Sequence, residues 1–431
     1  MTIELDKILT RGVTEVIVEE DLRRMLETDK PLRLKEGFDP SRPDIHLGHV
    51  VGLRKLRQFQ DLGHQVVLIV GDWTAQIGDP SGQSQIRTML SADEVRSNAE
   101  TYMQQFFKVV DREKTEVRWQ SEWFGNFKLE DVISLTSKFT VAQMLARDDF
   151  AKRYAAGHPI GITELMYPLL QAYDSVMIES DVEFGGIDQK FNCLMGRELQ
   201  QMMGQTAQQV FFTPLLVGTD GKMKMSKSLD NYIAVDDPPN EMYGKVMSLP
   251  DDLIMDYFEL ITDVPDEELG EYRKALSADS INPMFLKKRL AHEIVAEFHD
   301  LAAADTAQTE FEKVVQSREV PSDTPEIRIS FNEYIGPQIE RQPSDLLEVQ
   351  SINSSGNFIH GAVSLVHILT RYGIVKSNSE AKRLIAQGAV NIIYPDGQKR
   401  VYTDGMYIRD GIVIKVGKRR FVKIINADKA D

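Results

Sequence analysis

At 431 residues the chain is longer than a single hydrophobic core usually supports, so we expect two or three domains. Apolar residues make up 42% of it, but no apolar run approaches the roughly 20 residues of a membrane helix and the first residues lack a secretion-signal pattern, so we expect no membrane partner. The net charge of −16 by itself argues against a nucleic-acid partner, and a single cysteine, Cys193, excludes a disulfide framework and favours the reducing cytoplasm.

The first elements predict a βαβ unit. Residues 31–38 are predicted as a strand, and apolar side chains at helical spacing then predict a helix over 46–62, stopped by Gly63. The fully apolar stretch 66–70 is typical of a strand buried in a parallel sheet. Strand, helix and strand within about 40 residues predict a doubly wound α/β domain of the Rossmann type.

Two histidines, His46 and His49, stand at the start of this predicted helix with Gly48 between them. Spaced three residues apart, they share one face where free N–H groups and the helix dipole favour an anion. Gly48 would let a flat base or a ribose approach the backbone. The pattern His-x-Gly-His also occurs by chance and in other adenylate-forming transferases, so it does not identify the activity alone.

A later helix carries a polar stripe. Tyr167, Gln171 and Asp174 are spaced i, i+4 and i+7, so they lie on one side of a helix. Apolar residues cover most of the remaining surface, and the stripe is therefore predicted to line a polar pocket rather than to face solvent. In the segment 185–189 two glycines permit close backbone approach and Asp188 can pair with ribose hydroxyls, although a simple turn is the alternative.

A second signature follows a predicted strand over 210–217. Lys224 and Lys227 are three residues apart in a loop with Ser228 beside them, which suits the β- and γ-phosphates of ATP. A sequence of this kind more often forms a solvated basic loop without a ligand. Its place after His-x-Gly-His, however, matches the two signature motifs of class I aminoacyl-tRNA synthetases.

With these motifs the chain resembles the bacterial tyrosyl-tRNA synthetases over nearly its whole length. The resemblance rests on the stretches 37–40, 77–82, 167–174, 185–189 and 224–232. It implies that L-tyrosine is activated by ATP, with Mg²⁺, to tyrosyl-adenylate and pyrophosphate. Tyrosine would then pass to the 3′ end of tRNA(Tyr), and the protein would be a homodimer.

The resemblance also implies the roles of individual residues. In the tyrosine pocket Asp174 would accept a hydrogen bond from the phenol, and Tyr167, Gln171 and Asp79 would hold the ammonium group. Gln189 would lie near the carboxylate, and Lys35 stands where many relatives have a tyrosine near the phenol. The implied catalytic residues are His46, His49, Arg87, Lys224, Lys227 and Ser228, and the implied ATP-binding residues are Gly37, Asp39, Ser41, Gly48, Gly186, Asp188, Leu216 and Val217. No residue is expected to ligate a resident metal.

The domain organisation follows from composition along the chain. We expect the α/β catalytic domain with a helical insertion over 1–234, a helical domain over 235–318, and a Pro- and Ser-containing linker over 319–360. Residues 361–431 are expected to form a small α+β RNA-binding domain. Within it, the segment 361–425 holds twelve Lys and Arg against four Asp and Glu. The first 360 residues are therefore acidic, with a net charge of −23.

This C-terminal segment resembles the small RNA-binding fold that is shared with a ribosomal small-subunit protein, through residues 379–385 and 388–390. The residues expected to contact tRNA phosphates are Lys382, Arg383, Lys418, Arg419 and Arg420. A stabilising tail with a chance cluster of solvated lysines is the alternative.

Two other functions fit parts of the sequence. One is an adenylyl or nucleotidyl transferase of the same superfamily that acts on a small molecule, against which the lysine loop and the basic tail count. The other is a catalytically weak RNA-binding protein on a synthetase scaffold. It stays open because Gln83, Ala75 and Ile187 replace the Lys, Gly and Thr or Ser that are usual in the family. Tyrosine-dependent ATP–pyrophosphate exchange separates the three functions.

Overall fold

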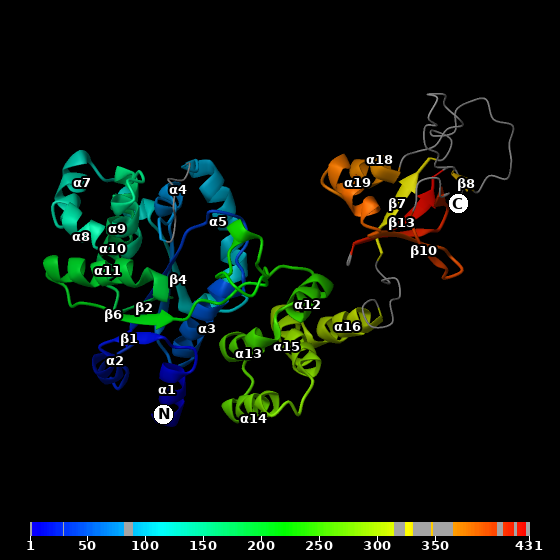
Figure 1. The fold of residues 1–431 in the computed structure, drawn as a ribbon. Helices are drawn as coiled ribbons and strands as arrows, with labels where there is room; N and C mark the ends of the chain where they lie inside the picture. The colour runs from blue at the N-terminus through cyan, green and yellow to red at the C-terminus, as the bar shows by residue number, and fades with distance from the viewer. Residues whose placement is uncertain are drawn as a thin grey trace. The chain divides into compact units, whose positions relative to one another are not determined.

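The computed structural model describes residues 2–28, 30–81, 89–313, 324–330, 346–347, 365–402, 408–417 and 420–427. The chain forms two compact units, Met1–Gln308 and Thr309–Asp431, which are described separately (Figure 1). Among the described residues, no helix combines the length and the apolar character needed to span a bilayer.

A six-stranded sheet forms the centre of the first unit. Its strands are β1 (Glu15–Ile17), β2 (Arg33–Phe38), β3 (Gln65–Val70), β4 (Thr115–Trp119), β5 (Val182–Gly186) and β6 (Gln209–Thr213), in the spatial order β1-β6-β5-β2-β3-β4. Neighbours pair in parallel except β1, which is antiparallel to β6. The chain moves outward from β2 to β4 and then returns to place β5 on the other side of β2. The expected doubly wound, Rossmann-like fold is confirmed, and its strand order reverses between β2 and β5.

Helices cover both faces of this sheet. They are α1 (Thr2–Thr10), α2 (Glu19–Leu26), α3 (Leu47–Asp61), α4 (Thr74–Ile77), α5 (Ala92–Phe106), α6 (Ser121–Phe124), α7 (Leu129–Thr136), α8 (Val141–Leu145), α9 (Asp148–Ala155), α10 (Ile162–Met177) and α11 (Lys190–Met202), with 3-10 turns at Arg112–Lys114, Ile187–Gln189, Lys227–Leu229 and Asp251–Leu253. Successive side chains of a strand point to opposite faces. Lys35 of β2 accordingly bonds to Gln171 of α10, whereas the carboxylate of Glu36 lies against Gly52 of α3.

Most of the expected elements of this unit are confirmed. The helix predicted over 46–62 is α3, and Gly63 follows it with a positive φ of 96°. The apolar strand is β3, and the polar stripe of Tyr167 lies on α10. The strand predicted over 210–217 is too long, because β6 ends at Thr213. Pro214 follows and has no N–H to continue the ladder.

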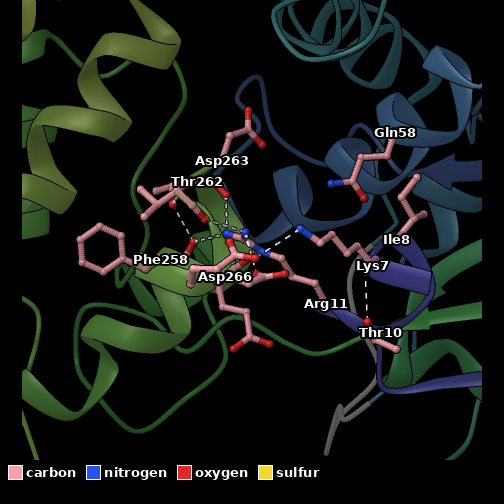
Figure 2. Close-up of polar contacts among 12 residues, drawn as sticks. Lys7, Ile8, Thr10, Arg11, Gln58, Phe258, Thr262, Asp263 and Asp266 are labelled. Atoms are coloured by element: carbon pink, nitrogen blue, oxygen red, sulfur yellow. Dashed lines mark hydrogen bonds and ion pairs between the residues drawn. The ribbon is translucent and has the colours of Figure 1, made fainter. Parts of the chain in front are cut away.

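A group of helices completes the first unit: α12 (Pro239–Met247), α13 (Ile254–Ile261), α14 (Asp266–Ser277), α15 (Pro283–Phe298) and α16 (Leu301–Phe311). Arg11, directly after α1, joins this group to the N-terminal segment (Figure 2). Its five N–H donors bond to the carbonyls of Phe258, Glu259, Thr262 and Val264 and to the carboxylate of Asp266, at 2.7–3.1 Å. The last carbonyls of a helix lack partners within it, and the Arg11 guanidinium bonds to two of the last four of α13, those of Phe258 and Glu259.

The second unit is α+β. Its sheet has the order β10-β9-β12-β13-β7, with β7 (Glu326–Ile329), β9 (Val390–Ile393), β10 (Lys399–Val401), β12 (Val413–Val416) and β13 (Arg420–Asn426). Helices α18 (Leu365–Arg371) and α19 (Asn378–Ala386) pack on it, and β8 (Leu346–Leu347) pairs with β11 (Ile408–Arg409). Strand β7 pairs in parallel with β13, so part of the segment expected as a linker is a strand of this sheet.

Candidate active site

A cleft of about 330 Å³ opens in the first unit at the carboxyl ends of the parallel strands. Its lining includes Gly37 to Asp39 at the end of β2, Phe184 to Gly186 at the end of β5, and the first turn of α3. The cleft therefore lies at the point where the strand order reverses, which is the usual ligand position in such sheets. Its volume falls within the range of small-molecule sites, about 300–1,000 Å³.

The cleft brings together most of the site residues that the sequence predicts. Those in its lining are Gly37, Asp39, Ser41, His46, Gly48, His49, Asp79, Tyr167, Gln171, Asp174, Gly186, Asp188, Gln189, Leu216, Lys224, Lys227 and Ser228. Arg87 and Gln83 lie outside the described residues. Lys35 and Val217 are described but do not line the cleft. Val217 instead accepts a hydrogen bond from the hydroxyl of Tyr257 at 2.6 Å through its carbonyl.

Lys35 lies beneath the cleft rather than at its wall. Its side chain is fully buried, and its ammonium group donates to the Gln171 carbonyl at 2.9 Å, the Ser175 hydroxyl at 2.8 Å and the Glu183 carboxylate at 2.8 Å. These three bonds use all three N–H donors. Because strand alternation directs Lys35 towards α10, it supports the backbone of Gln171. Its charge also acts on Asp174, and its place beside the ligand phenol stays a prediction.

The start of α3 presents two neutral imidazoles. The Nδ1 atom of His46 accepts from the Gly48 N–H at 3.2 Å, and the Nδ1 atom of His49 accepts from the His46 N–H at 3.1 Å. Burial lowers the pKa of His46 well below its ordinary value and that of His49 to about 3. A neutral imidazole that accepts at Nδ1 carries its proton on Nε2, so each ring is left with one N–H donor. A Cβ on Gly48 would lie 2.9 Å from Nδ1 of His46, which explains the glycine.

Asp174 is a buried acceptor in the lining of the cleft. Its Oδ2 accepts from the side-chain amide of Gln120 at 2.8 Å, and its Oδ1 accepts from the indole N–H of Trp123 at 3.1 Å. Burial raises the pKa of Asp174 to about 7, while the nearby Lys35 opposes the shift. Two N–H donors favour the ionised carboxylate, whose remaining lone pairs can accept from a ligand.

A hydrogen-bond network extends from Asp174 across the cleft. The carbonyl oxygen of the Gln120 side chain accepts from the backbone N–H of Thr74 at 3.0 Å, and the Thr74 hydroxyl donates to Asp39 at 2.7 Å. The hydroxyl of Tyr167 donates to the other oxygen of Asp39 at 2.8 Å. A carboxylate, an amide and two hydroxyls thus hold one another in fixed positions before a ligand binds.

A second network fixes the expected ammonium site. Asp79 accepts from the Gln189 amide at 2.8 Å, and Gln189 in turn accepts from Asn192 at 3.0 Å. Asn192 also donates to Gln171 at 3.1 Å, and the amide nitrogen of Gln171 donates to Glu183 at 3.1 Å. Asp79 lies at one end of this chain, where a ligand cation would meet a carboxylate.

The two signature lysines bond to different partners. Lys224 pairs with Asp188 at 2.7 Å, so the residue expected to hold a ribose already contacts a cation. Lys227 donates to the hydroxyl of Tyr102 at 2.7 Å and to the Arg42 carbonyl at 3.1 Å. Burial lowers the pKa of Lys227 to about 7; Asp44 raises it and Arg42 lowers it.

In the second unit, Lys382 and Arg383 are exposed on α19. Arg420 instead donates to the Ile374 carbonyl at 2.7 Å and to Glu380 at 3.0 Å. Two of its N–H donors therefore join parts of the second unit. Lys418 and Arg419 lie outside the described residues.

Sequence reasoning missed several residues of the cleft. They are Glu36, Arg42, Thr74, Tyr102 and Gln120, all in its lining, and Trp123, which bonds to Asp174. For Gln120 a signal was present, because it directly follows a strand that ends beside the apolar β3. For the others no recognisable spacing exists, since each comes from a different element.

The two ends of the cleft differ in chemistry. One end offers the carboxylates of Asp79 and Asp174 with amide groups between them, which suits a small ligand with an ammonium group and a hydroxyl. The other end offers lysine ammonium groups, imidazole N–H donors and the positive end of α3, which suits a polyphosphate. The arrangement can join a small amino-bearing molecule to a nucleotide.

Comparisons with known proteins agree with this chemistry. Residues 27–316 match the family described as tRNA synthetases class I (W and Y). A tyrosine–tRNA ligase of Dehalococcoides mccartyi (strain CBDB1) is 57% identical over 422 residues, which cover 98% of each chain. One of Thermotoga maritima is 48% identical over 419 residues, which cover 97% of this chain and 96% of that one.

Solved structures share the fold of about 70% of this chain at lower identity. A C-terminally truncated mitochondrial tyrosyl-tRNA synthetase of Aspergillus nidulans aligns with a TM-score of 0.61 at 22% identity, over 72% of this chain and 93% of that one. The tyrosyl-tRNA synthetase of Archaeoglobus fulgidus, solved with L-tyrosine, aligns with a TM-score of 0.58 at 24% identity, over 71% of this chain and 99% of that one. At such identities the likeness shows the fold alone.

Proposed function

This chain belongs to the class I tRNA synthetases for tryptophan and tyrosine, and from that premise we propose that it is a tyrosine–tRNA ligase. It activates L-tyrosine with ATP and transfers the tyrosyl group to the 3′ end of tRNA(Tyr). The observation that carries the proposal is the buried Asp174 carboxylate, which Gln120 and Trp123 hold in the cleft. This cleft lies where the strand order reverses, between β2 and β5. A phenol satisfies this acceptor and a phenyl ring does not. Discrimination of this kind, in which the wrong ligand leaves a buried polar group unpaired, is known from tyrosyl-tRNA synthetases themselves.

The ammonium group of tyrosine pairs with Asp79, and Tyr167 and Gln171 complete that part of the pocket. This assignment is supported by the network that joins Asp79 to Gln171 through Gln189 and Asn192. Tyr167 donates to Asp39, so its hydroxyl oxygen keeps lone pairs that can accept from an ammonium group.

Adenylate formation needs positioning and charge stabilisation rather than a covalent enzyme intermediate. The tyrosine carboxylate attacks the α-phosphate of ATP, and the bond to the bridging oxygen of pyrophosphate breaks. Lys224, Lys227 and the Nε2–H groups of His46 and His49 stabilise the charge on the departing phosphates. ATP enters as its Mg²⁺ complex, in which the phosphates carry the ion.

Transfer to tRNA uses the second unit as an anchor. Lys382 and Arg383 on α19 are exposed and able to meet phosphates. The acidic first 360 residues, with net −23, would repel a polyanion, so a separate basic surface is needed.

The enzyme works as a homodimer in the cytoplasm. The dimer is supported by large apolar side chains that stay exposed on or beside α7–α10: Leu129, Ile133, Val141, Tyr154 and Ile162, each 59–79% exposed. Contiguous exposed apolar surface marks interaction sites. The reducing compartment is supported by the single cysteine, Cys193, which is buried in α11. Light scattering of the wild type and of Ile133→Glu tests the dimer; a monomeric wild type would refute it.

Tyrosine-dependent ATP–pyrophosphate exchange tests the activity itself. We expect exchange with tyrosine and almost none with phenylalanine or tryptophan. Equal exchange with phenylalanine would remove the role of Asp174. If none of the amino acids drives exchange, a transferase for another small molecule would remain. If exchange is absent and tRNA binds tightly, an RNA-binding protein would remain.

A further inference from the structure

The loop that carries Lys227 is docked against two other segments of the first unit. Asn231 organises the loop, because its side chain accepts from the Ser226 N–H at 2.8 Å and donates to Asp220 at 3.2 Å. The docking itself is reciprocal. Lys227 donates to the Arg42 carbonyl at 3.1 Å, and the guanidinium of Arg42 donates to the Lys227 carbonyl at 3.4 Å.

The second docking partner, Tyr102, comes from α5, far from both signature motifs in the sequence. Tyr102 as a residue is 3% exposed. Its ring packs edge-on against Phe106, with ring centroids 5.7 Å apart, and the centroid of the His49 ring is 6.4 Å away. Packing therefore fixes the ring, and its hydroxyl lies at the cleft lining 2.7 Å from the ammonium nitrogen of Lys227. Burial raises the pKa of Tyr102, so the hydroxyl is neutral at working pH.

The ammonium group of Lys227 depends on these acceptors. The ammonium group is mostly buried, which disfavours its charged form. The Tyr102 hydroxyl and the Arg42 carbonyl take up two of its three N–H donors, which leaves one to meet a phosphate oxygen. Lys224 differs, because its partner is Asp188, 2.7 Å away.

We propose that Tyr102 is a positioning residue for adenylate formation: its hydroxyl holds the Lys227 ammonium at the phosphate end of the cleft. The proposal rests on the proposed function, because it assigns the phosphates of ATP to that end. The Lys227 ammonium also lies over the Tyr102 ring, 4.6 Å from its centroid. Without the hydroxyl, Lys227 would keep this ring contact and the Arg42 carbonyl but would lose the directional bond and sample other rotamers, so fewer complexes would have the charge in place at the transition state.

The test is a double-mutant cycle on Tyr102→Phe, which keeps the packed ring and removes one oxygen. We expect the rate of adenylate formation at saturating tyrosine and ATP to fall about tenfold, on the order of one lost hydrogen bond to a charged group. The KM for tyrosine should not change, because the hydroxyl bonds to Lys227 whereas Asp174 is held by Gln120 and Trp123. In a Lys227→Ala background, Tyr102→Phe should change the rate by less than about twofold, since no ammonium is left to position.

Lys224→Ala supplies the matched control. In that background Tyr102→Phe should keep its full effect of about tenfold, because Lys224 does not contact Tyr102. Thermal unfolding of Tyr102→Phe and the wild type checks that the fold is intact.

The pH dependence of the rate gives a readout that a purely structural role would not move. A hydroxyl acceptor favours the charged ammonium, so Tyr102→Phe should move the deprotonation limb of the profile to lower pH. The other groups that face Lys227 are Asp44 and Arg42, and His46 and His49 on α3, which stay neutral across this range. They are the same in both proteins, so the difference between the two profiles reports Lys227.

The results separate the two hypotheses. If wild-type protein shows no tyrosine-dependent exchange, the proposed function fails. If wild-type exchange is normal and Tyr102→Phe matches it, or if the loss is equally large in the Lys227→Ala background, the positioning role of Tyr102 is overturned.

Discussion

Asp174 is a buried carboxylate with both oxygens already engaged by donors, and its protonation state should govern tyrosine binding. Burial raises its pKa to about 7, and only the ionised form presents two charged, proton-free oxygens that accept from Gln120, Trp123 and a ligand together. Below this pKa the group takes up a proton, so tyrosine affinity should weaken by up to roughly tenfold per pH unit as pH falls from about 7 to about 6. Equilibrium binding of tyrosine without ATP at about pH 6, 7 and 8 measures the effect.

The control for this prediction is Asp174→Asn. Lys227, with a pKa of about 7, and Glu36, with a pKa of about 8, also titrate near this range, but both remain in the variant. Tyrosine binding by Asp174→Asn should therefore be weaker and nearly independent of pH. A variant that keeps the wild-type slope would assign the pH dependence to another group.

Glu36 is a second buried carboxyl group, and it should cost stability as pH rises. Its Oε2 has no hydrogen-bond partner among the described residues, and burial, with Glu183 nearby, raises its pKa to about 8. The folded state then keeps a proton that the unfolded chain loses above its ordinary value of 4.5, so the free energy of unfolding falls between about pH 5 and 8 and levels off above.

Replacing Glu36 by Gln removes this titration. Glu36→Gln should match the wild type near pH 5 and exceed it near pH 8 by about 1–3 kcal/mol, because only the wild type must take up a proton to fold at the higher pH. Urea unfolding at the two pH values measures the difference. An equal difference at both would show that the gain comes from packing. Gly52→Ala should also destabilise, because a Cβ there would clash with the Glu36 carboxylate.

At this scale the sequence could predict residues that share a local pattern. Tyr167, Gln171 and Asp174 are recognisable because the helical period places them on one side of α10. The partners of Asp174 are not recognisable, because Gln120 and Trp123 reach it from the end of β4 and from α6. The burial of Lys35 was not recognisable for the same reason, because Glu183, far along the chain, pairs with its charge.

At the scale of elements, the hydrogen bonds of Arg11 should make the N-terminal segment essential to the stability of helices α12–α16. Arg11 bonds to four carbonyls and one carboxylate around the end of α13 (Figure 2). Lysine keeps the charge but has three donors instead of five, so Arg11→Lys should lower the free energy of unfolding by about 2–3 kcal/mol. Urea unfolding measures this change.

Arg23→Lys is the matched control for Arg11→Lys. Arg23 pairs with Asp6 and Glu19, whose side chains are about half exposed, so its replacement should change stability by no more than about 0.5 kcal/mol. Equal losses in the two variants would mean that the carbonyl bonds of Arg11 contribute little beyond charge.

Long periodic elements were predictable and short strands were not. The helix α3 follows from periodicity over many residues, and β3 follows from a continuous apolar run. β1 has three residues and β7 has four, which is too short for a period to show. Their partners, β6 and β13, lie far along the chain, so only tertiary pairing makes strands of them.

At the scale of the whole molecule, we propose that the two compact units divide chemistry from RNA recognition. Every described residue in the lining of the cleft belongs to the first unit, and the basic segment 361–425 belongs to the second. Because β7 pairs with β13, a cut within the expected linker, after Gly356, would leave β7 without its sheet. A cut after Lys313 removes the second unit together with β7.

Truncation after Lys313 should therefore leave tyrosine-dependent pyrophosphate exchange largely intact and lower tRNA charging by at least about tenfold, since the remaining acidic body repels a polyanion. The same electrostatics predict that charging by the full-length enzyme weakens as salt rises while exchange responds less. Both reactions are measured side by side on the truncated and full-length proteins, after cooperative unfolding has been verified for each. Full charging by the truncated protein would show that the basic unit is not the tRNA anchor. Loss of exchange in a folded truncated protein would show instead that the second unit supports the cleft.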